Sequence, residues 1–177
     1  MDATVLHLAP GTHVAAERAP KERYLRIFMR DHLAGIQAGV SLARRALGPN
    51  RENAVGRVLA PLHLELMEDR ALLRELAHAV EVRPSRAKLL AAWMGERLGR
   101  LKLNGQLRGY SPLSRVYELE SLTLICAWRV SLWRLLERHA RLDGRLAGVN
   151  HALRAELAER RGLELERTLI DASVETF

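Results

Sequence analysis

Acidic residues within apolar helical stripes are the side chains of this sequence best placed for chemistry. Glu65 and Asp69 lie one helical turn apart within a run of leucines, and Glu120 falls on the apolar face of a later segment. His32 falls on an apolar stripe nearer the N-terminus. If these side chains converge, they could bind iron or manganese, which accept carboxylate and imidazole ligands. The candidate metal ligands are His32, Glu65, Asp69 and Glu120, with Glu68 and Glu118 as alternates if the helices rotate slightly.

A second interpretation of the same carboxylates needs no metal. Buried carboxylates are costly unless a partner compensates their charge. Arginines that reach inward would form a salt-bridged network in the core, and we favour this interpretation over the metal site. The arginines placed for this role are Arg70, Arg115, Arg129 and Arg160.

Positive charge is concentrated in one segment. Between Val82 and Tyr117 there are eight basic residues and one acid, Glu96, so this segment alone carries +7, which equals the formal net charge of the whole chain. Clustered cations can bind the phosphates of nucleic acid or acidic lipid, or an acidic protein. The alternative is that these residues pair with acids of neighbouring helices. The candidate anion-binding residues are Arg97, Arg100, Lys102 and Arg108.

The elements that must position these residues are helices. Apolar residues recur at helical spacing, β-branched residues are few, and aromatic residues make up 5% of the chain. The expected long helices span about residues 21–47, 51–82, 112–141 and 145–177, with a shorter helix over 85–103. Ser111 followed by Pro112 predicts an N-cap, and Pro61 predicts a kink or a fresh start within the second long helix.

Length and composition predict one domain. We expect residues 1–20 to form a flexible arm, because they contain three breakers without a sustained period, and residues 21–177 to form a single bundle with a basic crossover at 82–117. The lone cysteine, Cys126, lies in an apolar run and predicts a buried thiol. No signal peptide or membrane-spanning run is evident, which predicts a cytoplasmic protein.

The order of these elements carries a resemblance. Two long helices, a long connection with a short helix, and two further long helices, together with the acids at 65–69 and 118–120, resemble the ferritin-like superfamily. The resemblance is closest to uncharacterised ferritin-like proteins of GC-rich bacteria that lack the standard di-iron motif. It covers residues 21–175 and implies an all-α, ferritin-like four-helix bundle with a short helix in the crossover.

The metal motif of that superfamily is incomplete here. Its di-iron members use a Glu from each of two helices and a Glu-x-x-His from each of the other two. The one such pair in this chain, Glu75 and His78, sits near the end of its helix, and His151 on the last helix is preceded three positions earlier by Gly148. A relict site, with the fold kept and the ligands replaced, fits this departure.

Three hypotheses for function follow. The first is a non-catalytic bundle with a structural or protein-interaction role and no cofactor, which forms a homo-oligomer, with a dimer as the expected form. The second is a divergent dimetal-carboxylate oxidoreductase or metal-storage protein with iron or manganese. The third is anion or nucleic-acid binding through the basic crossover. No nucleophile elbow, phosphate-binding glycine loop or zinc-spaced cysteine pair is present, so we assign no catalytic residue.

Overall fold

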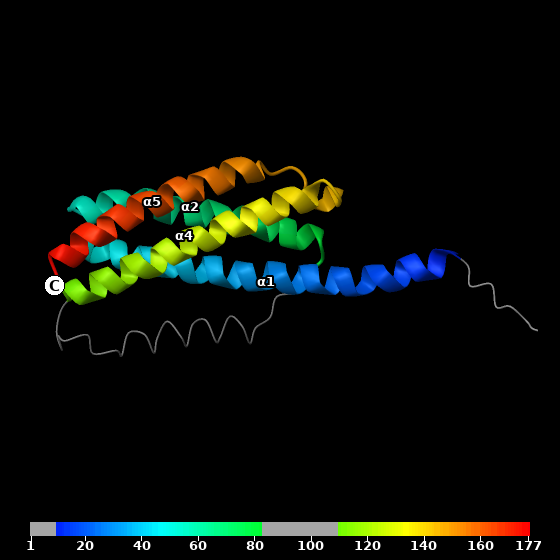
Figure 1. Cartoon of the computed structure of the whole chain (residues 1–177), viewed down its shortest axis with the longest axis horizontal. Helices are drawn as coiled ribbons and strands as arrows, with labels where there is room; N and C mark the ends of the chain where they lie inside the picture. The colour runs from blue at the N-terminus through cyan, green and yellow to red at the C-terminus, as the bar shows by residue number, and fades with distance from the viewer. Residues whose placement is uncertain (1–9, 83–109) are drawn as a thin grey trace, which may run out of the picture.

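The described part of the chain is all-α, as the sequence predicted. The computed structural model describes residues 10–82 and 110–177, in which four long helices and one short 3₁₀ helix occur and no strand is present (Figure 1). The helices are α1 (Pro10–Asn50), α2 (Ala54–Ala79), α4 (Pro112–Ala140), η1 (Gly144–Leu146) and α5 (His151–Val174).

The four long helices form two antiparallel pairs. Helix α1 packs against α2 and α4 against α5, and the two pairs meet where α1 contacts α4 and α2 contacts α5. Within the described residues, the backbones of α2 and α4 are not in contact, so these two helices lie diagonally across the bundle. Because α2 and α4 run in the same direction in Figure 1, residues 83–109 connect opposite ends of the bundle.

The core consists of two apolar clusters, one toward each end of the bundle. The first, called here the Leu66 cluster, also contains Val40, Leu59, Leu119, Cys126 and Leu165. The second, called the Leu73 cluster, also contains Met29, Ile36, Leu132, Trp133 and Leu146. Each cluster has members from α1, α2, α4 and α5. Burial of large apolar side chains stabilises each end of the bundle by roughly 1.5–3 kcal/mol per side chain.

The first helix is longer than predicted at both ends. It begins at Pro10 rather than after Pro20, so residues 10–20, which we expected in a flexible arm, are its first turns, and residues 1–9 lie outside the described residues. A proline removes one backbone hydrogen bond but need not end a helix. At the other end α1 continues to Asn50, whose side-chain amide donates to the carbonyl of Ala46 (2.8 Å) and to the hydroxyl of Tyr110 (2.9 Å). Residues 10–20 and 48–50, which we predicted to lie outside this helix, therefore belong to it.

Capping side chains set the other boundaries. Ser111 caps α4 as predicted, and its hydroxyl accepts from the backbone N–H of Ser114. Helix α2 begins at Ala54, not Arg51, because Asn53 accepts from the N–H of Gly56, and Pro61 lies inside α2 without ending it.

The last long helix also begins later than predicted, at His151. Asn150 caps it by accepting from the N–H of Leu153. Gly148, which precedes it with φ of 92°, adopts a left-handed conformation that suits glycine. The segment expected as the first turn of a helix is therefore η1 followed by a turn.

Close packing of α1 on α4 depends on Gly35. A Cβ atom at Gly35 would lie 1.8 Å from Cζ3 of Trp128 on α4, whereas a Cβ at Gly39 would lie 3.2 Å from Cγ2 of Ile125. Of these two glycines, Gly35 therefore permits the closer approach of α4.

We expect Gly35→Ala to destabilise the protein by about 1–3 kcal/mol, the usual cost of overpacking, although alanine has the higher helix propensity by about 1 kcal/mol. Gly39→Ala is the matched control on the same helix and should stay within about 1 kcal/mol of wild type, because propensity offsets its milder contact. Urea unfolding monitored by circular dichroism measures both. Equal effects of the two substitutions would contradict the packing argument.

Candidate functional site

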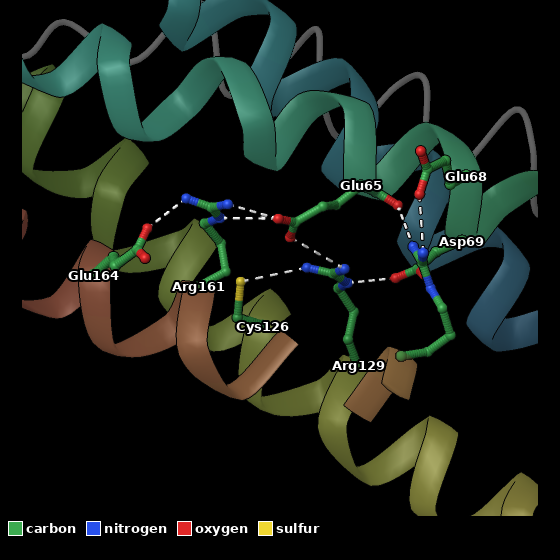
Figure 2. A network of polar contacts seen from close by, with 8 residues as sticks. Glu65, Glu68, Asp69, Cys126, Arg129, Arg161 and Glu164 are labelled. Carbon is green, nitrogen blue, oxygen red and sulfur yellow. Dashed lines mark hydrogen bonds and ion pairs between the residues drawn. The ribbon is translucent and has the colours of Figure 1, made fainter. Parts of the chain in front are cut away.

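A layer of charged side chains separates the two apolar clusters. Asp69 lies on α2 between Leu66 of one cluster and Leu73 of the other, and Arg129 reaches it from α4. Figure 2 shows how the side chains of this layer converge from three helices. We call it the arginine–carboxylate network, and its members are Glu65, Glu68 and Asp69 on α2, Arg129 on α4, and Arg154, Arg161 and Glu164 on α5.

Asp69 and Arg129 form the centre of the network. Both are fully buried, and Nε of Arg129 donates to Oδ2 of Asp69 at 2.5 Å. The other carboxylate oxygen, Oδ1, accepts from Nε of Arg154 at 2.7 Å. Each oxygen of Asp69 therefore faces a different guanidinium, and one buried carboxylate joins α2 to both α4 and α5. Since α2 and α4 lie diagonally, the Arg129 side chain bridges the middle of the bundle.

Glu65 extends the network by one turn of α2. Its Oε1 accepts from Arg161, at 2.6 Å from Nη2 and 3.2 Å from Nε, so the guanidinium fork meets this oxygen with two donors. Its Oε2 lies 3.7 Å from Nη2 of Arg129, and these two atoms form an ion pair without a hydrogen bond. Arg129 thus contacts both interior carboxylates and ties the two halves of the network together.

The outer members connect the buried pairs to solvent. Nη1 of Arg154 donates to the exposed Glu68 (2.9 Å), and its Nη2 donates to the backbone carbonyl of Glu65 (3.0 Å). Nη1 of Arg161 donates to Glu164 on the same helix. With three arginines and four carboxylates, the network is close to electrically balanced, which reduces the cost of burying its central charges.

The electrostatics of these groups follow from burial and pairing. Burial lowers the pKa of Arg154, but Asp69 and Glu68 more than offset this effect, so its pKa is raised. Arg161 shows the same balance, with Glu65 as the main opposing group. Burial also raises the pKa of the Cys126 thiol, although Nη1 of Arg129 lies 3.7 Å from its sulfur and partly opposes the shift. The thiol is therefore buried, as predicted, and is held in its neutral form.

The proposed metal ligands do not converge. Glu65, Glu68 and Asp69 are together on α2, but Glu120 is exposed on α4. The alternate Glu118 accepts from Nε of Arg45 and from the Tyr110 hydroxyl, both at 2.9 Å. Within residues 10–82 and 110–177, no group of three or more His, Cys, Asp or Glu side chains is arranged to hold a metal ion.

His32 occupies an aromatic stack rather than the carboxylate layer. Its ring lies 4.2 Å from that of Trp128, nearly parallel, and 4.0 Å from that of Phe28. Nδ1 lies 2.9 Å from the carbonyl oxygen of Phe28, so it carries the proton donated in that bond. Burial lowers the pKa of His32, which the hydrogen bond and the charge of Asp31 oppose in part. The imidazole therefore serves as a neutral packing residue between α1 and α4.

Only one of the four arginines predicted to reach inward is in the network. Arg129 is, whereas Arg70 donates to Gln37 (3.0 Å) and Arg115 to Glu175 (3.3 Å), and Arg160 is exposed. Sequence reasoning missed Arg154 and Arg161. Their spacing of seven residues, on the face that also carries Ala158 and Leu165, was the signal that could have identified them.

The predicted anion-binding residues cannot be placed in the fold. Arg97, Arg100, Lys102 and Arg108 all lie outside the described residues. Two acids of neighbouring helices are paired with other arginines, Glu68 with Arg154 and Glu159 with Arg134.

Comparisons of the chain with protein families, with curated proteins and with solved structures find no match. Among the described helices, none is long and apolar enough to cross a membrane.

Removing one partner of the central pair should destabilise the fold strongly. We expect Asp69→Asn to lower the free energy of unfolding by about 3–5 kcal/mol, because it leaves two buried guanidinium groups without their carboxylate. The double variant Asp69→Leu with Arg129→Leu should lose less stability than Asp69→Leu or Arg129→Leu alone, because it removes both charges while Arg154 keeps Glu68. Urea unfolding of wild type, these two single variants and the double variant gives the double-mutant cycle.

The matched control for this cycle is a surface ion pair that also involves α4. Arg134 and Glu159 join α4 to α5 at 2.9 Å, and both side chains are more than half exposed. Glu159→Gln should cost less than about 1 kcal/mol, because solvent screens the pair. An equally small effect of Asp69→Asn would show that the network does not stabilise the bundle.

Proposed function

We propose that the protein is a non-catalytic, ferritin-like helical bundle in which arginines occupy the place that metal ions hold in dimetal-carboxylate bundles. The observation that carries this proposal is the pairing of Asp69 with Arg129 and Arg154, and of Glu65 with Arg161. The central carboxylates of a dimetal bundle need cations to compensate their charge. Here guanidinium groups of the same chain supply that charge, and the carboxylate oxygens are directed at them.

The arrangement of the helices also supports the proposed ferritin-like architecture. Two antiparallel pairs, with the second and third long helices running in the same direction, require a connection along the length of the bundle. The sequence provides residues 80–111 between α2 and α4 for that connection.

Metal analysis tests the proposal directly. Protein purified from cells supplemented with iron and manganese should carry neither metal in stoichiometric amount, and a chelator should not shift its thermal unfolding midpoint, because the arginines already compensate the carboxylates. Inductively coupled plasma mass spectrometry measures the first and differential scanning calorimetry the second. About two tightly held metal ions per chain would overturn the proposal in favour of the dimetal oxidoreductase or metal store.

The proposed role is an interaction role, carried by the exposed side of α5 and directed at a second copy of the chain. Three large apolar residues there are between 52% and 79% exposed and follow one another at spacings of seven and four residues, a pattern typical of helix pairing. These residues, called here the α5 seam, are Leu163, Ile170 and Val174. A seam of this kind suits the homodimer that the sequence led us to expect.

We expect the wild-type chain to sediment at twice its 20.0 kDa mass and the double variant Ile170→Glu with Val174→Glu to sediment as a monomer. Each glutamate would place a charge in an apolar contact between the two copies. The matched control is Leu64→Glu, since Leu64 is 60% exposed but lies on α2, and this variant should remain dimeric. A monomeric wild type, or dissociation by both variants alike, would contradict pairing through the α5 seam.

A further inference from the structure

A pocket of about 840 Å³ lies between α1 and the end of α4, next to η1. Its apolar lining comes from α1, α4, the turn after α4 and η1, and consists of Leu25, Phe28, Leu135, Leu136, Leu142 and Leu146. Leu136 and Leu146 are buried members of the Leu73 cluster, so the core of the bundle forms the floor of the pocket. Small-molecule sites are also mainly apolar and enclose roughly 300–1,000 Å³. The pocket therefore has the size and the lining of a ligand site.

Three of the large apolar side chains that line the pocket are exposed to solvent. Leu142 is 80% exposed, Tyr24 67% and Leu135 46%. An apolar ligand in the pocket would remove part of this surface from water, which favours binding. On α1 the lining extends from Lys21 to Phe28, which corresponds to about 10 Å at about 1.5 Å per helical residue. A pocket of this length suits an alkyl chain of medium length.

Ion pairs fix the position of one charged side chain at the pocket. The charged residues of the lining are Lys21, Glu22, Asp143 and Arg145. Nε and Nη2 of Arg145 donate to the carboxylate of Asp143 at 2.7 to 3.1 Å, and Nη2 also donates to Glu22 of α1 at 3.3 Å. The second carboxylate oxygen of Glu22 accepts from Arg26 at 3.3 Å. Arginines therefore compensate both acids of the lining.

One nitrogen of this fixed guanidinium remains available to a ligand. Within residues 10–82 and 110–177, Nη1 of Arg145 has no hydrogen-bond partner, whereas Nε and Nη2 are held by Asp143. Because the guanidinium is already held in place, it loses little conformational freedom when Nη1 donates to a ligand. Lys21 adds a second cation to the lining. A carboxylate is the head group that accepts strong hydrogen bonds from both kinds of cation.

We propose that this pocket binds a fatty acid of medium chain length. The alkyl chain lies against Leu25, Leu135 and Leu142, and the carboxylate lies at Nη1 of Arg145 and the ammonium group of Lys21. The apolar walls favour the chain, and the fixed guanidinium selects a negatively charged head group over a positively charged one. This site is separate from the α5 seam, and the proposal does not rest on the proposed function.

Isothermal titration calorimetry of the full chain with decanoate tests the ligand class. Decanoate should bind at one site per chain and at least about tenfold more tightly than decyltrimethylammonium, because only the anion accepts hydrogen bonds from the two cations. Each methylene removed, as in octanoate, should weaken binding by up to about fourfold. Equal affinities for decanoate and decyltrimethylammonium, or no binding of decanoate up to millimolar concentration, would overturn the proposal.

Matched substitutions test the place of binding. Leu142→Asp adds a carboxylate to the wall at an exposed position and should weaken decanoate binding at least about tenfold. Leu64→Asp is the control, since Leu64 is 60% exposed but lies on α2 outside the pocket, and it should leave the affinity unchanged. If both variants weaken binding alike, or neither does, decanoate binds elsewhere and the proposal is wrong.

A third variant tests the head group. Arg145→Gln should reduce the preference for decanoate over decyltrimethylammonium at least about fivefold, because it removes the fixed charge. Circular dichroism checks that this variant keeps its helices. An unchanged preference in a folded variant would overturn the role of Arg145, and the Leu142→Asp comparison decides the place of binding even if Arg145→Gln fails to fold.

Discussion

The bundle depends on one charged pair at its centre. Arg129 and Asp69 are both withdrawn from water, so each is tolerable only because the other is present and because further groups share the charge. The pair joins α2 to α4, whose backbones do not touch, and Arg154 joins the same carboxylate to α5. Any rotation or sliding of one of these helices would separate a buried ion from its partner. The pair therefore specifies how three of the four helices are aligned.

The apolar clusters on either side have less power to specify alignment. Leucines at helical spacing can slide by a turn and still meet other leucines, so burial by itself favours a compact bundle more than a particular register. A guanidinium that must meet defined carboxylate oxygens has no equivalent alternative one turn away. Stability thus comes mainly from the Leu66 and Leu73 clusters, whereas the charged layer between them supplies uniqueness.

The sequence was informative about helices and inward carboxylates, and less so about partners. Glu65 and Asp69 were identified because they interrupt an apolar stripe, which is a local pattern. Their arginines come from helices 60 to 96 residues away along the chain. A long arginine side chain can point inward or toward solvent from a similar backbone position, so helical phase alone left Arg129 as one candidate of four and missed Arg154 and Arg161. Several predicted helix boundaries were wrong for a related reason, because an asparagine cap or a proline is compatible with more than one boundary.

The pairing of Asp69 with Arg129 and Arg154 also affects what this carboxylate can bind. A carboxylate whose two oxygens each face a guanidinium already has its charge compensated, and a metal ion placed beside it would be repelled by Arg129 and Arg154. Releasing Asp69 would require Arg129 to leave an environment in which it is fully buried and has its other contacts, with Glu65 and Cys126, in the same layer. The charged layer therefore holds the described helices together. On their surface, apolar side chains are exposed in rows with helical spacing.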